Sequence, residues 1–306
     1  MNFLALISVI SLAFCSSHYG QVEEAKAFEK GQVFVNGIGQ KMIWVAPGNF
    51  CMGDVAGDGA DDERPVRKVE LSGYHLAATE VTQSQWQQVM ETTVEKQAEK
   101  ALQDDTSYPE FSGNTLRGLM KIPRDGGDHR LLLEGTGADL PMYWVSWEEA
   151  ADFCRRLTEA EHKAGRLPEG HAFQLPTEAQ WENACRSGTQ EAYAGELDAM
   201  AWYAGSSEMK MAPVAGKQPN TWGFFDMHGS VWEWCRDWYA DTYTGLQTQD
   251  PEGPEDGRYR VYRGGSWGAA AADCRSASRT GFTPTNRNGG LGFRVAVSPV
   301  PTGENP

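Results

Sequence analysis

Two blocks rich in tryptophan and glycine decide the fold of this chain: NTWGFFDMHGSVWEWC at residues 220–235 and RGGSW at residues 263–267, followed by CR at 274–275 and GFR at 292–294. Glycine permits turns and close backbone approach, and tryptophan contributes large rigid plates. Their density indicates aromatic side chains packed against loops, with little regular helix. Loop-rich domains can form a ligand site in this way, and we interpret the upstream chain as the scaffold.

The composition describes a globular and acidic protein. Its 306 residues suffice for one large or two ordinary domains, and 40% of them are hydrophobic. The 27 basic and 42 acidic side chains give a net charge of −15, which argues against nucleic-acid or anionic-membrane partners. Cations, sugars, peptides, small molecules and proteins stay open as ligands, and the oligomeric state is not specified.

The first residues predict export. Residues 1–14 form an apolar run of signal-peptide length, so we expect a signal segment over 1–20 and a periplasmic, secreted or surface location. Leu12-Ala13-Phe14-Cys15 also resembles a lipoprotein signal, which leaves a lipid anchor as one alternative and a buried N-terminal helix as another. The run is too short for an ordinary transmembrane helix, and no second candidate follows it.

The cysteines leave their pairing open. There are six, at positions 15, 51, 154, 185, 235 and 274, and export would remove or lipidate the first. The absence of a CxxC motif disfavours a redox dithiol or a zinc ribbon. Cys235 with Cys274 is the most attractive disulfide because both lie in the aromatic blocks. Cys154 with Cys185 remains an alternative, as does a buried Cys274 thiol.

The remaining chain indicates one domain. We expect a lead-in at 21–39, a domain over 40–298 with an insertion at about 92–139, and a tail at 299–306. Strands are expected at 42–45, at 67–70 and at 74–77, and residues 47–53 are expected to form a turn that leads into a further strand. The acidic loop 54–63 lacks the ligand spacing of an EF-hand, so it is interpreted as solvated.

Three helix starts carry a capping box, in which Ser or Thr precedes Gln or Glu by three residues. The pairs are Thr82 with Gln85, Ser146 with Glu149, and Thr177 with Gln180. The second helix is expected to run to about Leu157, with Ala150, Phe153, Cys154 and Leu157 facing inward. Helices set against irregular strands predict an α+β fold.

A series of motifs occurs in order over about residues 40–298. They are PGNF at 47–50 with MG at 52–53, ERP at 63–65, EVTQ at 80–83, VSW at 145–147, LPTE at 175–178 with WE at 181–182, and the blocks quoted above. On these residues the chain resembles the formylglycine-generating enzymes, also called sulfatase-modifying factors. The resemblance implies a C-type-lectin-like fold with little regular secondary structure.

The resemblance also brings the family's oxidase chemistry into question. Oxidase members bind copper(I) with two cysteines, three and eight residues after the serine of Gly-Gly-Ser. Those positions are Ala269 and Cys274 here, and alignment backwards from Ala277-Ser278-Arg279 leaves Cys274 matching neither cysteine. One thiolate cannot form a two-thiolate copper site. We therefore expect no copper and no standard formylglycine generation, while other catalysis stays open.

The resemblance implies a calcium site in the first block. Its ligands match Asp226, Gly229, Val231 and Glu233: two side-chain oxygen donors and two backbone carbonyls. Hard oxygen ligands suit calcium. The alternative is that Asp226 and Glu233 cap the turn without metal. His228 is interpreted as a structural residue rather than a base, because no positioned nucleophile accompanies it.

The second block supplies the candidate ligand contacts. In the family the Gly-Gly-Ser strand lines the cleft, so the resemblance assigns ligand binding to Ser266 and Trp267. Arg263 and Arg279 are further candidates, although arginines here could equally tie strands to carboxylates. Ser266 and Cys274 are the only candidates for a catalytic group.

Three functions remain at this point. The first is an exported family member that binds a ligand or protein, or acts as a maturation factor, on a calcium-stabilised scaffold. The second is an oxidase or another modifying enzyme that acts on a peptide or small molecule. The third arises from residues 268–290, which resemble the variable region of lectin-fold proteins diversified by retroelements. An ordinary surface loop explains that pattern as well.

Overall fold

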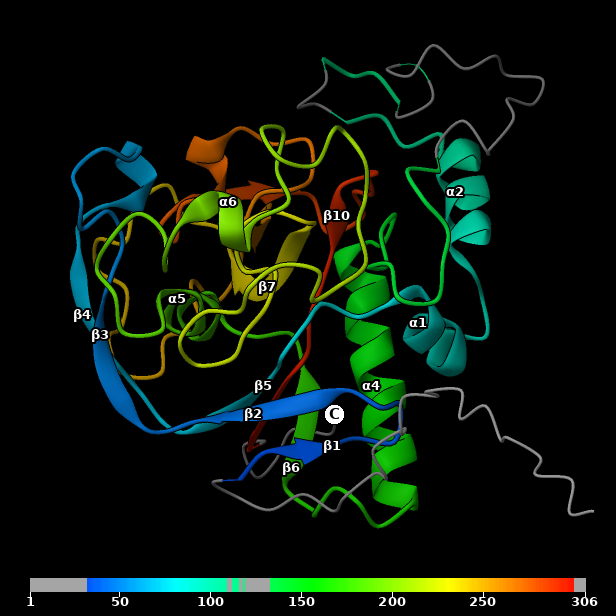
Figure 1. Cartoon of the computed structure of the whole chain (residues 1–306), viewed down its shortest axis with the longest axis horizontal. Coiled ribbons are helices and arrows are strands. Elements are labelled where there is room, and N and C mark those ends of the chain that lie inside the picture. Colours follow the sequence, from blue (N-terminus) through cyan, green and yellow to red (C-terminus); the bar gives the residue numbers. More distant parts are fainter. Residues whose placement is uncertain (1–31, 109–111, 116–117, 119–132, 300–306) are drawn as a thin grey trace, which may run out of the picture.

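A five-stranded antiparallel sheet joins the two ends of the domain (Figure 1). The computed structural model describes residues 32–108, 112–115, 118 and 133–299. In spatial order the strands are β1 (Phe34–Val35), β2 (Lys41–Val45), β5 (Tyr74–Ala77), β11 (Ala296–Pro299) and β6 (His171–Gln174). Strand β11 pairs with β5 on one side and β6 on the other, so the last strand closes against early and middle segments.

Both tryptophan blocks enter a second sheet. Its strands, in spatial order, are β10 (Leu291–Gly292), β7 (Trp232–Trp238), β8 (Arg260–Arg263) and β9 (Arg279–Phe282). Glu233 on β7 stands opposite Gly292 on one neighbour and Arg263 on the other. A separate hairpin pairs β3 (Gly48–Met52) with β4 (Arg67–Leu71). The predicted strands at 42–45, 67–70 and 74–77 are confirmed, whereas the turn predicted over 47–53 was wrong, because residues 48–52 are themselves the strand β3.

Three helices begin where the predicted capping boxes place them: α1 (Gln83–Met90), α4 (Trp147–Lys163) and α5 (Glu178–Arg186). Helices α2 (Val94–Gln103) and α6 (Leu197–Met200) carry no predicted box, and 3-10 turns occur at Asp61–Glu63 and Ala271–Cys274. All three predicted boxes form in both directions. For α4, the Glu149 N–H donates to Ser146 Oγ at 3.2 Å, and the Ser146 N–H donates to Glu149 Oε2 at 3.0 Å.

The sequence underestimated the length of one helix and did not predict two other elements. The helix expected to end near Leu157 continues to Lys163, and its predicted inner face is buried. Thr158 and Glu161 extend that face, because each is buried against a specific partner rather than against apolar surface. Helix α2 and strand β6 were not predicted. Helix α2 does carry a helical pattern, with Val94, Ala98, Ala101 and Leu102 buried on one face, but its residues were interpreted as part of the insertion. Strand β6 has only four residues, so tertiary packing decides it.

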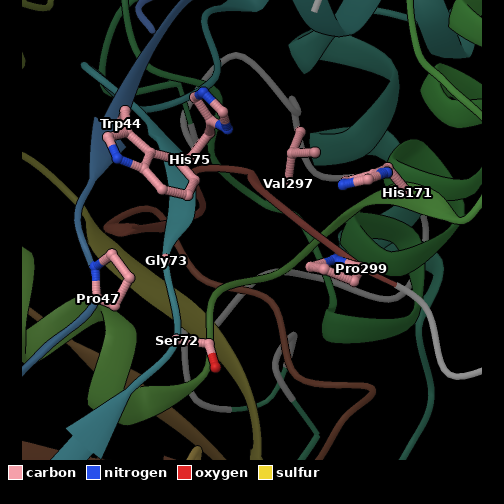
Figure 2. Close-up of a pocket in the computed structure, with 8 residues that line it drawn as sticks. All are labelled: Trp44, Pro47, Ser72, Gly73, His75, His171, Val297 and Pro299. Carbon is pink, nitrogen blue, oxygen red and sulfur yellow. The ribbon is translucent and has the colours of Figure 1, made fainter. Parts of the chain in front are cut away.

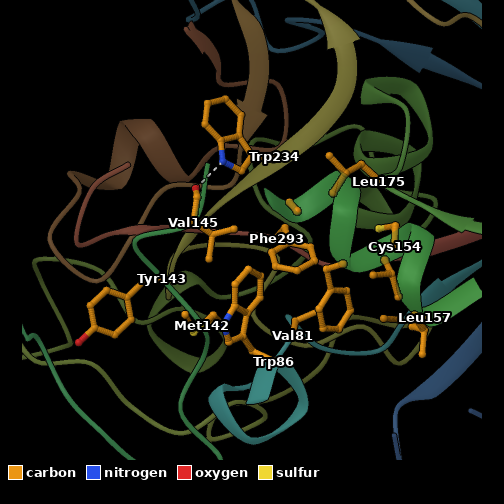
Figure 3. Packing of buried hydrophobic residues seen from close by; sticks show 14 of the residues in the cluster. Val81, Trp86, Met142, Tyr143, Val145, Cys154, Leu157, Leu175, Trp234 and Phe293 are labelled. Carbon is orange, nitrogen blue, oxygen red and sulfur yellow. Dashed lines mark hydrogen bonds between the residues drawn. The ribbon is translucent and has the colours of Figure 1, made fainter. Parts of the chain in front are cut away.

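The larger core cluster lies between α1, α4 and the C-terminal strands (Figure 3). The Trp86 and Phe153 rings stack at 5.8 Å between centroids, and Phe293 meets Phe153 edge-on at 5.2 Å. Trp234 Nε1 donates to the Val145 carbonyl at 2.9 Å, so its one polar atom is satisfied. A second cluster surrounds Trp181 on α5. The tryptophans thus act as the rigid core plates that the sequence indicated.

The acidic loop 54–63 is pinned at both ends, unlike the solvated loop that was expected. Asp54 and Glu63 are both buried. Asp54 accepts hydrogen bonds from the Gly57 and Gly59 N–H groups and pairs with Arg64 at 2.9 Å. Glu63 receives two bonds from Arg275, of 2.7 and 2.6 Å. Arginines therefore compensate the carboxylates at each end of the loop.

The predicted disulfides do not form. Cys51, Cys154, Cys185, Cys235 and Cys274 are all free thiols. Cys154 and Cys185 lie in different core clusters, which excludes their pairing. Cys235 lies on β7, where its sulfur contacts the Glu233 carbonyl of the same strand at 4.0 Å. Cys274 is the last residue of a 3-10 turn. Shared aromatic surroundings in the sequence did not bring these sulfurs together.

Several sequence predictions fall partly or wholly outside the described residues. These are the signal segment at 1–20, the lead-in up to residue 31, much of the insertion at 92–139, and the tail beyond residue 299. Within the described part of the chain, no helix has both the length and the apolar character needed to cross a membrane.

Candidate functional site

Three of the four candidate cation ligands, Asp226, Gly229 and Val231, lie in one tight turn before β7, and the fourth, Glu233, lies on β7 itself. Asp226, Gly229 and Ser230 have φ values of 59°, 96° and 65°, in the left-handed region that favours glycine. A Cβ at Gly229 would lie 2.2 Å from the Trp202 carbonyl oxygen, so only glycine fits. The Ser230 N–H donates to that same oxygen at 2.7 Å. The turn is thereby fixed against the segment that carries Trp202.

The Glu233 carboxylate is fully engaged by protein donors. Its Oε2 accepts from Arg294 Nε at 2.6 Å and from Trp181 Nε1 at 2.9 Å, and its Oε1 accepts from Arg294 Nη2 at 2.7 Å. Arg294 also donates to the carbonyls of Ala77 and Phe225. All of these charged groups are buried. This two-bond ion pair is the strong form of arginine–carboxylate contact.

Asp226 is only half engaged. Its Oδ2 accepts from the Ala215 N–H at 2.7 Å, while its buried Oδ1 has no hydrogen-bond donor among the described residues. Burial raises the pKa of Asp226 to about 6, against the lowering effects of the Ala215 N–H and the Arg294 charge. A buried carboxylate oxygen without a donor is compensated by a proton, a water or a cation.

Glu80 is a member of this cluster that the sequence analysis missed. It lies between β5 and α1, is fully buried, and neither carboxylate oxygen meets a donor in the described chain. Burial, followed by the charges of Asp226 and Glu233, raises the pKa of Glu80 well above its usual value. The signal available was a carboxylate beside a core valine in the EVTQ motif, which had served only as a family match.

These residues suit a cation in part. Asp226 offers a free hard oxygen, as calcium requires, but Arg294 and Trp181 already satisfy Glu233. Across the described ranges, no three His, Cys, Asp or Glu side chains converge into a metal cage. Backbone carbonyls and a small number of carboxylates would therefore hold the cation. That composition resembles the implied set at Asp226, Gly229, Val231 and Glu233.

The second candidate region is the face around Ser266 and Trp267. Ser266 is 8% exposed, and Trp267 is partly exposed, with its Nε1 donating to the Gly289 carbonyl at 3.2 Å. Ala269 is partly exposed, and its carbonyl accepts the Ala204 N–H at 3.0 Å. Beside this segment lies Met209, which is 57% exposed. The structure brings together an aromatic ring, a flexible methionine and a hydroxyl.

Arg263 and Arg279 are both buried and have partners within the protein. Arg263 is fully buried and hydrogen-bonds Glu182 and the carbonyls of residues 276–278. Arg279 forms two bonds to Glu178, of 2.6 and 2.9 Å. These contacts match the strand-tying role that the sequence analysis weighed against ligand binding. Neither guanidinium is offered to a ligand in this arrangement.

Cys274 has the surroundings of an unreactive thiol. It is fully buried, and a Cβ at Gly265 would lie 2.4 Å from its sulfur. Burial raises the pKa of Cys274 to about 12, and that of the nearby Cys185 to about 12 as well. A thiol must lose its proton to act as a nucleophile or metal ligand. Both groups therefore stay protonated at neutral pH.

His228 is a buried structural imidazole. Its Nε2 accepts the Ala194 N–H at 3.1 Å, so Nδ1 carries the hydrogen that is donated to the Cys274 carbonyl at 2.8 Å. Burial lowers the pKa of His228 to about 4. Both ring nitrogens are occupied by backbone groups, which leaves no atom for base catalysis.

A pocket of about 280 Å³ lies elsewhere, where β5 and β11 diverge (Figure 2). Trp44, His75, His171 and Pro299 are among the side chains that line it. His75 Nε2 lies 2.8 Å from the Gln32 carbonyl. None of the residues predicted to bind metal or ligand lines this pocket.

The chain belongs to the family described as the sulfatase-modifying factor enzyme 1-like domain, which matches residues 30–299. It is similar to the formylglycine-generating enzyme of Streptomyces coelicolor, with 31% identity over 81% of this chain and 86% of that enzyme. It is also 29% identical to the inactive C-alpha-formylglycine-generating enzyme 2 of Mus musculus, over 84% of this chain and 85% of that protein.

Other relatives place the same domain in a larger chain. The serine/threonine-protein kinase pkn1 of Chlamydia pneumoniae is 32% identical over 96% of this chain, which spans only 42% of the kinase. Among solved structures, Treponema denticola variable protein 1 matches with a TM-score of 0.63 and 29% identity, over 89% of this chain and 98% of that one. PvdO of Pseudomonas aeruginosa shares the fold, with a TM-score of 0.67 and 22% identity over 89% of this chain and 99% of that one. These similarities confirm the predicted α+β fold of the formylglycine-generating enzyme and C-type-lectin type.

Proposed function

We propose that this protein is an exported, ligand- or protein-binding member of the family that lacks the copper-dependent oxidase activity. The main support for this proposal comes from the residues at the two positions where the family has its copper-binding cysteines. Ala269 has no thiol, and Cys274 is sealed beneath Gly265.

The chemical argument concerns ligand number and protonation. Copper(I) in this family needs two thiolates, and soft sulfur ligands cannot be replaced by alanine. Cys185 and Cys235, the other thiols in this part of the protein, are both fully buried with raised pKa values. Neither of these two buried thiols can compensate for Ala269.

The binding face that remains is the segment around Ser266 and Trp267. A partly exposed tryptophan beside an exposed methionine offers a rigid apolar plate and an adaptable neighbour, which suit a peptide or protein surface. The ring of Trp267 is anchored through the Gly289 carbonyl, and its backbone carbonyl accepts the Ser207 hydroxyl at 2.6 Å. A pre-positioned aromatic side chain loses little conformational entropy on binding.

Calcium is proposed as the stabiliser of the scaffold beneath this face. The free oxygen of Asp226 and the strained turn through Gly229 and Ser230 support it. When bound, calcium would supply positive charge to a buried acidic turn and hold backbone carbonyls in place. The protein's own residues orient the turn through Trp202 and Arg294.

The test uses a labelled, cysteine-containing sulfatase peptide as the probe. The purified protein is expected to bind it without converting the cysteine, and to fail to compete for copper(I) against a chelator. Trp267→Ala should weaken peptide binding by about tenfold, the scale of losing one aromatic contact. The Streptomyces coelicolor enzyme serves as the positive control for conversion.

The outcomes separate the alternatives. Conversion of the peptide together with tight copper(I) binding would establish an active oxidase and overturn the proposal. If Trp267→Ala binds the peptide as tightly as the wild type, the peptide binds at another surface. No binding would remove peptides of this class as ligands.

One observation favours a second candidate, a retroelement-diversified binding protein. The relative Treponema denticola variable protein 1 aligns over nearly its whole length, and residues 268–273 expose small side chains between buried framework positions. A near-identical template repeat and a reverse-transcriptase gene in the flanking DNA are the expected results. Their absence would eliminate this candidate.

Export is tested on the mature chain. N-terminal sequencing and intact mass are expected to show loss of about residues 1–20, as the signal-segment rule indicates. A lipid-modified Cys15 would instead establish anchoring. A mature chain that begins at residue 1 or 2 would overturn export.

A further inference from the structure

Buried charge around Glu80 is not balanced by the protein. Three carboxylates, on Glu80, Asp226 and Glu233, are buried in this region together with one guanidinium, that of Arg294, which bonds Glu233 and the Phe225 carbonyl. Their full ionisation leaves a formal charge of −2 in the interior. Burial of an uncompensated charge is costly, so buried carboxylates are normally paired, protonated or bound to metal.

The imbalance is concentrated on two of the three carboxylates. Arg294 and Trp181 deliver three donors to Glu233, so that group is satisfied. Glu80 Oε1 and Oε2 and Asp226 Oδ1 receive no donor within the described residues. The segments that carry these two carboxylates are joined by the backbone, because the Phe225 N–H donates to the Ala78 carbonyl at 2.9 Å. Buried acceptors without donors are normally compensated by a proton, a water or a cation.

The burial of these oxygens and their chemistry indicate what that species is. All three orphaned oxygens are sealed from water-sized contact. An ordinary hydrogen-bonded water lies about 2.8 Å from an oxygen, whereas calcium approaches its ligands to about 2.3–2.6 Å. A cation therefore fits closer to these oxygens than a water molecule does. Carboxylate oxygens are also the ligands that hard divalent cations prefer.

We propose that Glu80 is a direct ligand of the cation held by the turn at 226–231, and that this cation bridges Glu80 and Asp226. Glu233 then supports the site through Arg294 rather than supplying its main charge. The ligand class is a hard divalent cation of the size of calcium. The inference rests on the proposed calcium-stabilised scaffold and adds to it a ligand from a distant part of the sequence.

The assignment has a structural consequence. Glu80 lies between β5 and α1, two residues before the helix-capping Thr82, and Asp226 precedes β7. A bridging cation would tie the N-terminal sheet and α1 to the turn of the second sheet. It would link the same segments that Arg294 joins through its bonds to the Ala77 and Phe225 carbonyls.

The test measures calcium affinity and melting temperature of the full chain after chelation. The wild type is expected to bind calcium and melt at a higher temperature with it. Glu80→Gln should keep the shape of the side chain, fold without calcium, and bind calcium about 100-fold more weakly or worse, because loss of even outer-shell partners changes affinity 10–100-fold. Magnesium, which demands a smaller octahedral cage, should give a smaller shift.

Glu161→Gln is the matched control. Glu161 is also buried, but Arg166 compensates it through bonds of 2.6 and 2.9 Å. This variant should lower the melting temperature and leave calcium affinity unchanged. It separates general damage to a buried glutamate from loss of a cation ligand.

Each outcome decides one point. If the wild type shows neither calcium binding nor a thermal shift, the calcium scaffold fails and this proposal fails with it. If the wild type responds and Glu80→Gln binds with equal affinity, the scaffold stands, and Glu80 only carries a proton shared with Asp226. If Glu80→Gln does not fold, Glu80→Asp takes its place. That variant keeps the charge on a shorter side chain, so weaker binding supports the proposal and unchanged affinity overturns it.

Discussion

Two buried acidic clusters in this protein solve the same electrostatic problem differently. In the cluster around α5, Glu178 pairs with Arg279, and Glu182 pairs with Arg263 and Arg186. In the cluster around the 226–231 turn, a single arginine faces three carboxylates. The first cluster carries its compensating charge within the chain, whereas the second needs a proton or cation from outside.

The difference shows that burial of acidic residues is not in itself a sign of a site. Glu178 and Glu182 are as deeply buried as Glu80. Their arginine partners hold the pKa of Glu178 below its usual value despite the opposing effect of burial, whereas burial and neighbouring negative charges raise that of Glu80. The presence or absence of a donor separates a structural network from a candidate ligand site.

The largest expected effect comes from removing one arginine from each cluster. Arg263→Met should lower the free energy of unfolding by about 3–5 kcal/mol, because Glu182 loses its buried partner. Arg294→Met should cause a comparable loss in chelator, and calcium should restore part of it. Urea denaturation with and without calcium measures both. Equal calcium rescue of the two variants would erase the distinction between the clusters.

Neutralising one glutamate in each cluster should change the free energy of unfolding in different directions. Glu182→Gln is expected to destabilise by about 2–3 kcal/mol, the scale of losing hydrogen bonds between charged groups. Glu80→Gln in chelator should leave stability unchanged or raise it, because it removes an uncompensated charge. Urea midpoints in chelator provide the comparison. If Glu80→Gln destabilises the protein as much as Glu182→Gln does, Glu80 is a compensated structural carboxylate like Glu182.

Glu149 provides an intermediate case that depends on pH. Burial opposes its ionisation, but Arg287, Lys100 and the Ser146 N–H hold the pKa of Glu149 at about 2. A lowered pKa adds stability above the ordinary value near 4.5, and this stability is lost as pH falls from there towards 2. We expect a contribution of about 2 kcal/mol after allowance for the exposed Lys100.

The measurement is the unfolding free energy at pH 6 and pH 3. Glu149→Gln should lower stability at pH 6 and flatten its decline towards pH 3. Glu159→Gln, on an exposed part of the same helix, is the control and should leave the slope unchanged. An unchanged slope in Glu149→Gln would contradict the assignment.

The smallest expected effect concerns the helix that carries the compensated cluster. Thr177 Oγ1 accepts the Gln180 N–H at 3.1 Å and caps α5. Thr177→Ala should cost about 1 kcal/mol, and Thr177→Ser should cost little. Thermal unfolding of the two variants measures the cap alone. A loss as large as that of Arg263→Met would show that the cap, rather than the ion pairs, maintains the network.

Local signals in the sequence predicted the local structure. The capping boxes at Thr82, Ser146 and Thr177 set three helix starts, because each depends on residues three positions apart. The length of α4 was underestimated, since Glu161 is buried through Arg166 rather than by hydrophobic periodicity. The expected disulfides were wrong, because two cysteines in aromatic surroundings need not have adjacent sulfur atoms.

The sequence by itself determined the family, the α+β class, the helix starts and the missing cysteine at position 269. Each of these depends on residue identity or on short spacing. Only the tertiary structure decided which acidic residues are compensated, that Cys274 is sealed, and that Glu80 is buried without a donor among the described residues. Charge pairing is a property of non-local contacts within a low-dielectric interior, and composition cannot report which carboxylate receives an arginine.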